Sequence, residues 1–334
     1  MRIFILVFLF VFSLAGCQSG DRNTKKGKNP VTAADSLEIV TEMIRQDSSD
    51  YQLYLQRAHL NVKLGKIDPA FRDVNRALEL NSQAPETFVL LSDLYFIMGN
   101  AEDAIAALKK AAELNPRNEV PYIKLAETYL ILKNYSMAQK STDVALSINV
   151  NNEQAYFLKG VAFMEQGDTV NAVINLRISA NLDTNNFAAY MQLAAIYQQQ
   201  HDSVAINYYK DALKARPDDE KALFGLARFC QELGRLDEAL TYYNKVNELY
   251  PGNKEAWFNS GYIYLVEKED YTQALHYFKQ AVYVDPAYVE AVYNLGRTYE
   301  AQGKYDEAAA QYRQALELHT NYPLAIEGLN RMHK

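Results

Sequence analysis

The chain has 334 residues, of which 49% are hydrophobic, so it is long enough to bury a large core. Its formal net charge of −7 argues against nucleic-acid binding, because proteins that bind phosphate backbones usually carry a basic field. Two cysteines are too few for a disulfide framework.

The N-terminus predicts export. An apolar run over residues 3–14 is too short to span a bilayer comfortably but suits the hydrophobic region of a signal peptide. The run ends in the sequence LAGC at Cys17, which resembles the lipobox of bacterial lipoproteins. This resemblance implies a signal peptide over residues 1–16, cleavage before Cys17, and lipidation of the Cys17 thiol as a membrane anchor. Gln18 favours the outer membrane, by resemblance to enterobacterial sorting. An ordinary secretory signal with a chance cysteine is the alternative.

A polar stretch comes next. Residues 17–35 carry Gly, Pro and four basic side chains without an apolar period, which predicts a flexible tether with a reach of roughly 25 Å. Residues 36–50 then place apolar side chains on one face of a helix. This amphipathic stretch is interpreted as an N-terminal capping helix for the segment that follows.

The remainder of the chain repeats with a period of about 34 residues. In the clearest copy, residues 289–322, large, small and aromatic side chains recur at the spacings of the tetratricopeptide repeat: Leu295-Gly296, Tyr299, Ala308, Tyr312 and Ala315. The resemblance implies an all-α fold, a right-handed α-solenoid of helix-turn-helix units over residues 36–334. The full units are predicted at 51–84, 85–118, 119–152, 153–186, 187–219, 220–253, 254–288 and 289–322, with a C-terminal helix over 323–334.

Some units depart from the pattern. The fifth is one residue short near His201, and the seventh is one residue long over 267–270; both changes are predicted to lie between helices. The first unit has Arg57 and Asn61 where apolar or aromatic residues are usual. Cys230 stands where other units place an aromatic residue, so it is interpreted as a buried, unreactive side chain.

No catalytic constellation emerges from the sequence. The five histidines lie far apart, and no metal-ligand pair, nucleophile motif or phosphate-binding glycine loop occurs. Because the repeats account for the chain beyond its tether, no segment remains for a catalytic domain. The chain is therefore predicted not to be an enzyme and to need neither cofactor nor metal.

The family resemblance also implies a concave groove lined by the first helix of each unit. Residues between the packing positions face that groove. In units six to eight the predicted partner-binding residues are Lys221, Phe224, Arg228, Phe258, Asn259, Tyr262, Tyr293, Asn294 and Arg297. Aromatic anchors beside amides and Arg suit an extended peptide, although solvated charges and ordinary repeat asparagines are an equal alternative. Of the carboxylate clamp found in chaperone-binding relatives, only Asn259 matches.

These features predict a non-catalytic scaffold that is lipid-anchored in the bacterial cell envelope and binds an envelope protein or extended peptide in its groove. Assembly of an envelope complex is the expected role. The alternative is an accessory lipoprotein that binds a small molecule or glycan through aromatics such as Phe258 and Tyr293. The partner, the membrane face and the oligomeric state stay open.

Overall fold

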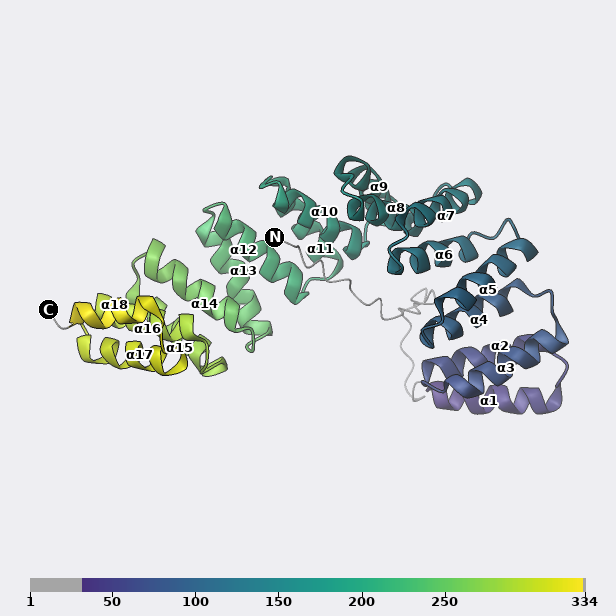
Figure 1. The fold of residues 1–334 in the computed structure, drawn as a ribbon, viewed down its shortest axis with the longest axis horizontal. Coiled ribbons are helices and arrows are strands. Elements are labelled where there is room, and N and C mark those ends of the chain that lie inside the picture. The colour runs from purple at the N-terminus through teal and green to yellow at the C-terminus, as the bar shows by residue number, and fades with distance from the viewer. Residues whose placement is uncertain (1–31, 333–334) are drawn as a thin grey trace, which may run out of the picture. The chain divides into compact units, whose positions relative to one another are not determined.

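The computed structural model describes residues 32–332, and every regular element in that range is helical (Figure 1). The chain divides into two compact units, residues 1–83 and residues 84–334, which are considered separately. The predicted signal peptide, Cys17 and most of the predicted tether lie outside the described residues. The prediction of an all-α solenoid fold is confirmed by this helical architecture.

Over residues 32–83, the first unit contains the helices α1 (Ala33–Gln46), α2 (Tyr51–Lys63) and α3 (Ile67–Leu80). Helix α1 begins within the stretch predicted as a tether because Thr32 and Asp35 form a capping box, in which each side chain accepts from the other residue's backbone N–H. Helix α1 packs on α2 and leaves Ile39 and Met43 exposed on its other side.

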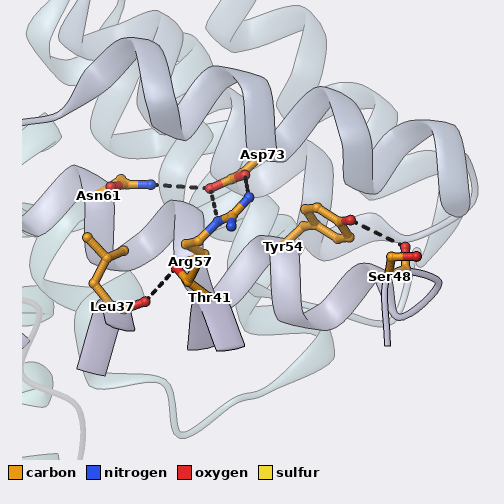
Figure 2. Close-up of polar contacts among 7 residues, drawn as sticks. All are labelled: Leu37, Thr41, Ser48, Tyr54, Arg57, Asn61 and Asp73. Atoms are coloured by element: carbon orange, nitrogen blue, oxygen red, sulfur yellow. Dashed lines mark hydrogen bonds and ion pairs between the residues drawn. The ribbon is translucent and has the colours of Figure 1, made fainter. Parts of the chain in front are cut away.

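A buried polar network replaces the usual apolar contact between α2 and α3 (Figure 2). The guanidinium of Arg57 donates two hydrogen bonds to the carboxylate of Asp73, at 2.9 and 2.5 Å. The amide of Asn61 donates to the same carboxylate at 3.2 Å. Asn61 and Asp73 are only 4% and 5% exposed. The two residues that made the first repeat look irregular in sequence are therefore compensated by an acid on the facing helix.

The second unit is a series of helix pairs in which each helix packs mainly on its neighbours in the chain (Figure 1). Its helices are α4 (Pro85–Ile97), α5 (Ala101–Leu114), α6 (Val120–Ile131), α7 (Tyr135–Ile148), α8 (Glu153–Glu165), α9 (Thr169–Leu182), α10 (Phe187–Gln199), α11 (Val204–Ala215), α12 (Glu220–Glu232), α13 (Leu236–Leu249), α14 (Lys254–Tyr262), η1 (Ile263–Glu267), α15 (Tyr271–Val284), α16 (Val289–Ala301), α17 (Tyr305–Leu318) and α18 (Pro323–Met332).

Small residues fix how closely the two helices of a pair approach. Ala308 and Ala315 on α17 are fully buried. A Cβ atom added at Gly296 would lie 2.8 Å from the ring of Tyr312, which is closer than packed atoms tolerate. The turn between the helices is closed by Gly303 at φ +73°, a backbone conformation that glycine adopts without strain. The recurring glycine and alanine pattern thus sets both the turn and the spacing of the pair.

The extra residue of the seventh repeat lies inside a helix, so its predicted place between helices is wrong. Helix α14 continues directly into the π-helical turn η1, where the backbone N–H of Lys268 donates to the carbonyl of Ile263 at 3.1 Å. A π-helical turn absorbs one added residue because its hydrogen bonds span five residues instead of four. Glu269, at φ +52°, then takes the place that glycine holds in most other turns. The missing residue of the fifth repeat does lie in the turn, after His201 at φ +53°.

Asn247 on α13 is a polar exception in the core. It is 5% exposed, and neither atom of its side-chain amide has a hydrogen-bond partner among the described residues. At the corresponding position the first, third, fifth and eighth repeats carry Leu78, Leu146, Leu213 and Leu316. A buried polar group without a partner lowers stability.

Replacing Asn247 by leucine is therefore expected to stabilise the second unit. The substitution removes an unpaired buried amide, whose desolvation costs about 1–3 kcal/mol, and installs the residue that other repeats already accommodate. Urea unfolding of the Asn247→Leu variant should show a higher midpoint with an unchanged slope. The variant Thr241→Leu, at an exposed position on the same helix, controls for a general gain from added leucine; an Asn247→Leu midpoint below that of the parent would contradict the expectation.

Candidate functional site

Three consecutive first helices, α12, α14 and α16, carry the nine predicted partner-binding residues. Lys221 and Arg228 are exposed on α12, and Phe224 lies half-buried between them. On α14, Phe258, Asn259 and Tyr262 are all half-buried. These six side chains are therefore at least partly accessible, as a binding surface requires.

An open pocket of about 350 Å³ lies where α12, α13 and the α14–η1 helix meet. Its lining includes two of the predicted residues, and the full set is Arg228, Gln231, Glu232, Leu236, Asn259 and Glu267. The helix that contains the inserted residue thus supplies Asn259 and Glu267 to the pocket. The lining mixes charged, amide and apolar groups, which suits a polar side chain or backbone segment better than an apolar anchor.

A hydrogen-bond chain holds the amides of this pocket in place. Asn259 donates to the hydroxyl of Tyr243 at 3.1 Å, and that hydroxyl donates to the side-chain carbonyl of Gln231 at 2.8 Å. Tyr243 is fully buried, and burial is the main cause that raises its pKa, so the hydroxyl stays protonated. Phe224 packs its edge against the Tyr243 ring, 5.7 Å between centroids. The site is consequently pre-organised by the core.

The basic side chains of the groove have internal partners. Arg228 lies 3.4 Å from the carboxylate of Glu232 on the same helix. Arg297 donates to the side-chain oxygen of Asn294 at 3.0 Å, and its guanidinium lies 6.0 Å from the centre of the Tyr293 ring. A carboxylate ligand would have to compete with these contacts.

Tyr293 and Asn294 are buried, in contrast to their predicted place on an open groove. They are 8% and 5% exposed. The Tyr293 ring lies edge-on to Tyr322, immediately before α18, at 5.5 Å, and Asn294 donates back to the carbonyl of Glu290 at 2.8 Å. Tyr293 thus packs where α16 meets the C-terminal helix, and Asn294 is bonded within its own helix, which sequence spacing alone does not reveal.

Other residues at this end of the chain were not singled out from sequence. Tyr288 precedes α16, and its ring lies 5.2 Å from that of Phe258. Glu255 and Glu290 are exposed at matching places in the first turns of α14 and α16. A usable signal existed: Tyr288 and Tyr322 recur one repeat apart, each immediately before a helix.

The acidic residues nearer the start of the second unit are also partnered. Asp93 on α4 pairs with Lys124 on α6 at 2.6 Å. Glu127 accepts a hydrogen bond from Gln154 on α8 at 2.6 Å. Burial, opposed by the nearby Lys124 charge, raises the pKa of Glu127 above that of an ordinary glutamate. These contacts tie neighbouring repeats together across their first helices.

Residues 32–332 show neither a metal site nor a reactive thiol. No group of three His, Cys, Asp or Glu side chains is arranged to hold a metal ion there. Cys230 is buried, and burial raises the pKa of its thiol to about 11, which disfavours the nucleophilic thiolate. In the same range, every helix falls short of the length and apolar character that crossing a membrane requires.

Comparison with known families identifies the repeat. The family described as "Tetratricopeptide repeat protein 21 N-terminal ARM repeat" matches residues 129–330, more than half of the chain. Two further families, both described as "Tetratricopeptide repeat", match residues 55–119 and 95–160. The chain belongs to the tetratricopeptide-repeat family. The predicted resemblance is thereby confirmed for the repeats, whose fold is generally a non-catalytic scaffold for protein–protein interaction.

Curated relatives of this tetratricopeptide-repeat protein match over short stretches only. The general transcriptional corepressor ssn6 of Schizosaccharomyces pombe is 26% identical over 120 residues, 35% of this chain and 11% of that protein. The human Superkiller complex protein 3 is 31% identical over 83 residues, 25% of this chain and 5% of that protein. The chain thus spans about a tenth or less of the length of these two relatives.

Solved tetratricopeptide-repeat structures agree over a larger share. The C-terminal part of a TPR repeat-containing protein from Cytophaga hutchinsonii matches with a TM-score of 0.63 and 20% identity, over 72% of this chain and 98% of that one. The pilF protein of Pseudomonas aeruginosa matches with a TM-score of 0.55 and 18% identity, over 63% and 96%. At these identities the likeness concerns the fold.

Proposed function

We propose that this protein is a non-catalytic scaffold, anchored by lipid at Cys17 to the bacterial cell envelope, and that its groove holds a partner protein or an extended peptide of that envelope. The observation that carries the proposal is the half-exposed pair Phe258 and Tyr262 on α14, the helix that also supplies Asn259 to the open pocket. Aromatic anchors next to fixed hydrogen-bonding groups are typical of residues that dominate protein interfaces.

Rigid presentation supports a binding role. The helices that carry the site are packed on both sides by neighbouring helices, and Asn259 is held by the buried Tyr243 hydroxyl. A partner that binds such a surface loses little free energy to ordering the scaffold. Lipid attachment would add to this effect by concentrating the scaffold at the membrane. The sequence LAGC ending at Cys17 supports that attachment, and Gln18 favours the outer membrane.

The anchoring is tested by replacing Cys17 with serine in the full chain. Two or more acyl chains are needed for stable membrane attachment, so the Cys17→Ser variant is expected to leave the membrane fraction and to lose labelling with a radioactive or clickable fatty acid. Cys230→Ser, which removes the other cysteine, serves as the matched control and should stay membrane-bound. Equal membrane retention of all three proteins would overturn lipid anchoring.

The binding site is tested by photo-crosslinking in cells. A photoreactive amino acid replaces Tyr262 in the groove or, as a control, Tyr283, which is 82% exposed on α15. We expect a discrete protein adduct from position 262 and not from position 283, weakened about tenfold by Phe258→Ala, since truncation of an interface anchor costs more than about 1 kcal/mol.

Phe258 also contacts Phe278 in the core, with 5.7 Å between the ring centroids, so Phe258→Ala could weaken the adduct by unfolding the protein. Circular dichroism of the Phe258→Ala protein tests for such unfolding. Equal adducts from both positions would place the partner away from the groove. If neither position gave an adduct while the protein stayed folded, the scaffold proposal would be contradicted.

A further inference from the structure

An acidic and aromatic surface lies between the first helices of the seventh and eighth repeats, all within the second unit. It consists of Phe258, Tyr288, Glu255 and Glu290, named here the α14–α16 subsite. Phe258 and Tyr288 are half-buried and pack on each other at 5.2 Å, whereas both glutamates are exposed. Neither glutamate forms an ion pair with any residue from 32 to 332.

The subsite already holds one cation of the protein itself. The ammonium of Lys254 lies 5.0 Å from the centre of the Tyr288 ring and donates to Asp285 at 2.6 Å. Besides this internal pair, the negative charges of Glu255 and Glu290 also stabilise the positive charge of Lys254. Burial is the largest cause that raises the pKa of Tyr288 to about 12, and the charges of Glu290 and Glu255 are the next largest. One lysine thus faces three carboxylates, which leaves an excess of two negative charges around an aromatic ring.

The negative charge of Glu290 also acts on Tyr322, which forms the next pair of aromatic rings with Tyr293. After burial, the charge of Glu290 is the largest cause that raises the pKa of Tyr322, the residue just before α18. The charge of Glu290 thus acts on two tyrosines, Tyr288 and Tyr322, each immediately before a first helix. Aromatic faces attract cations through the ring quadrupole, and a nearby carboxylate adds a charge-assisted hydrogen bond.

The cations that would favour an acidic ligand are engaged elsewhere. Arg297 is hydrogen-bonded to Asn294, and Arg228 is paired with Glu232. The unpaired charge at this end of the groove is therefore acidic. Charge complementarity therefore favours a basic group of the ligand here, whereas the arginines predicted from the sequence to line the groove favoured an acidic one.

We propose that the α14–α16 subsite binds a basic side chain, Arg or Lys, of the peptide segment held in the groove, with the ammonium or guanidinium at the exposed carboxylates of Glu255 and Glu290. This inference rests on the proposed function, because it names the charge of the residue that the same groove selects. Phe258 contacts the aliphatic stem of that side chain, and the two glutamates supply the selectivity for positive charge.

The experiment uses a random heptapeptide display library, selected at low salt on the soluble Cys17→Ser protein. The parent is expected to enrich peptides with Arg or Lys at one fixed distance from an apolar residue. The double variant Glu255→Gln, Glu290→Gln should enrich peptides without that preference. The control Glu248→Gln, Glu317→Gln changes two exposed glutamates on second helices α13 and α17 and alters the net charge equally. It should keep the preference.

A selected peptide is then synthesised with its arginine replaced by citrulline, which has the same shape without the charge. We expect the parent to bind the citrulline peptide about tenfold more weakly, and the double variant to bind both peptides alike. The difference should shrink in high salt.

The outcomes separate the two proposals. Selection of peptides without a basic residue, or a preference that survives in the double variant, overturns the basic subsite and leaves the groove scaffold standing. Failure of the folded parent and control to select any peptide overturns the peptide-binding groove, and the subsite with it.

Discussion

Replacing Asp73 by alanine is expected to destabilise the first unit by about 3 kcal/mol. The carboxylate is 5% exposed and accepts hydrogen bonds from both Arg57 and Asn61, so its removal leaves two donors without their acceptor. Breaking a buried ion pair costs about 3–5 kcal/mol, and the lower end applies because the Arg57 side chain keeps 23% of its exposure to water. Amide hydrogen exchange read over α2 and α3 measures the loss.

Two further variants decide whether the ion pair itself is responsible. Arg76→Ala breaks an exposed pair with Glu79 on the same helix and should lower stability far less than Asp73→Ala, because water screens the exposed charges. The double variant Arg57→Leu, Asp73→Leu replaces the pair with apolar groups and should recover much of the loss. If Asp73→Ala were as mild as Arg76→Ala, the network would contribute little and the account given for the first repeat would fail.

Removing the Tyr312 side chain is expected to release the C-terminal helix. Tyr312 is fully buried, and the backbones of Gly296 on α16 and Gly328 on α18 both lie directly against its ring. Truncating a fully buried aromatic to alanine costs about 3–5 kcal/mol. Because each repeat is stabilised mainly by its neighbours, the loss of hydrogen-exchange protection should be confined to α16, α17 and α18.

The hydroxyl and the ring of Tyr312 contribute separately. The hydroxyl donates to Glu300, which also accepts two hydrogen bonds from Arg331 on α18, at 2.8 and 2.9 Å. Tyr312→Phe keeps the ring and leaves Glu300 paired with Arg331, so it should cost only about 1–2 kcal/mol. Tyr312→Ala should in addition expose Tyr293, whose ring packs on that of Tyr312, and this is detectable as faster nitration of Tyr293 mapped by mass spectrometry. A uniform loss of protection along the whole second unit would contradict local stabilisation.

Much of the fold follows from local sequence pattern. The recurrence of glycine in turns, alanine on second helices and large residues on first helices predicts helix pairs, because each position's size is set by contact with the adjacent helix. Ala308, Gly303 and Gly296 show this directly, since each is used as its spacing predicts. The position of the missing residue in the fifth repeat follows as well, because a turn has no internal packing to conserve.

The repeat pattern could not predict features that depend on contacts between two separate helices. Arg57 and Asn61 looked anomalous until Asp73 on the facing helix was seen to pair with them. The π-helical turn at Ile263 was not predicted, because an inserted residue can be absorbed in a helix or a turn, and only the packing on both sides decides between them.

The binding surface shows the same division. The sequence by itself determined that the protein is a tetratricopeptide-repeat solenoid, because repeat periodicity fixes which helix face each residue occupies. From the same periodicity it predicted Phe258 and Arg228 as groove residues, which stays a prediction. Only the tertiary structure decided that Tyr293 is covered by Tyr322, that Arg297 is engaged, and that unpaired Glu290 stands beside Tyr288. The physical reason is that exposure and charge balance depend on contacts between helices, and a period within one helix carries no information about them.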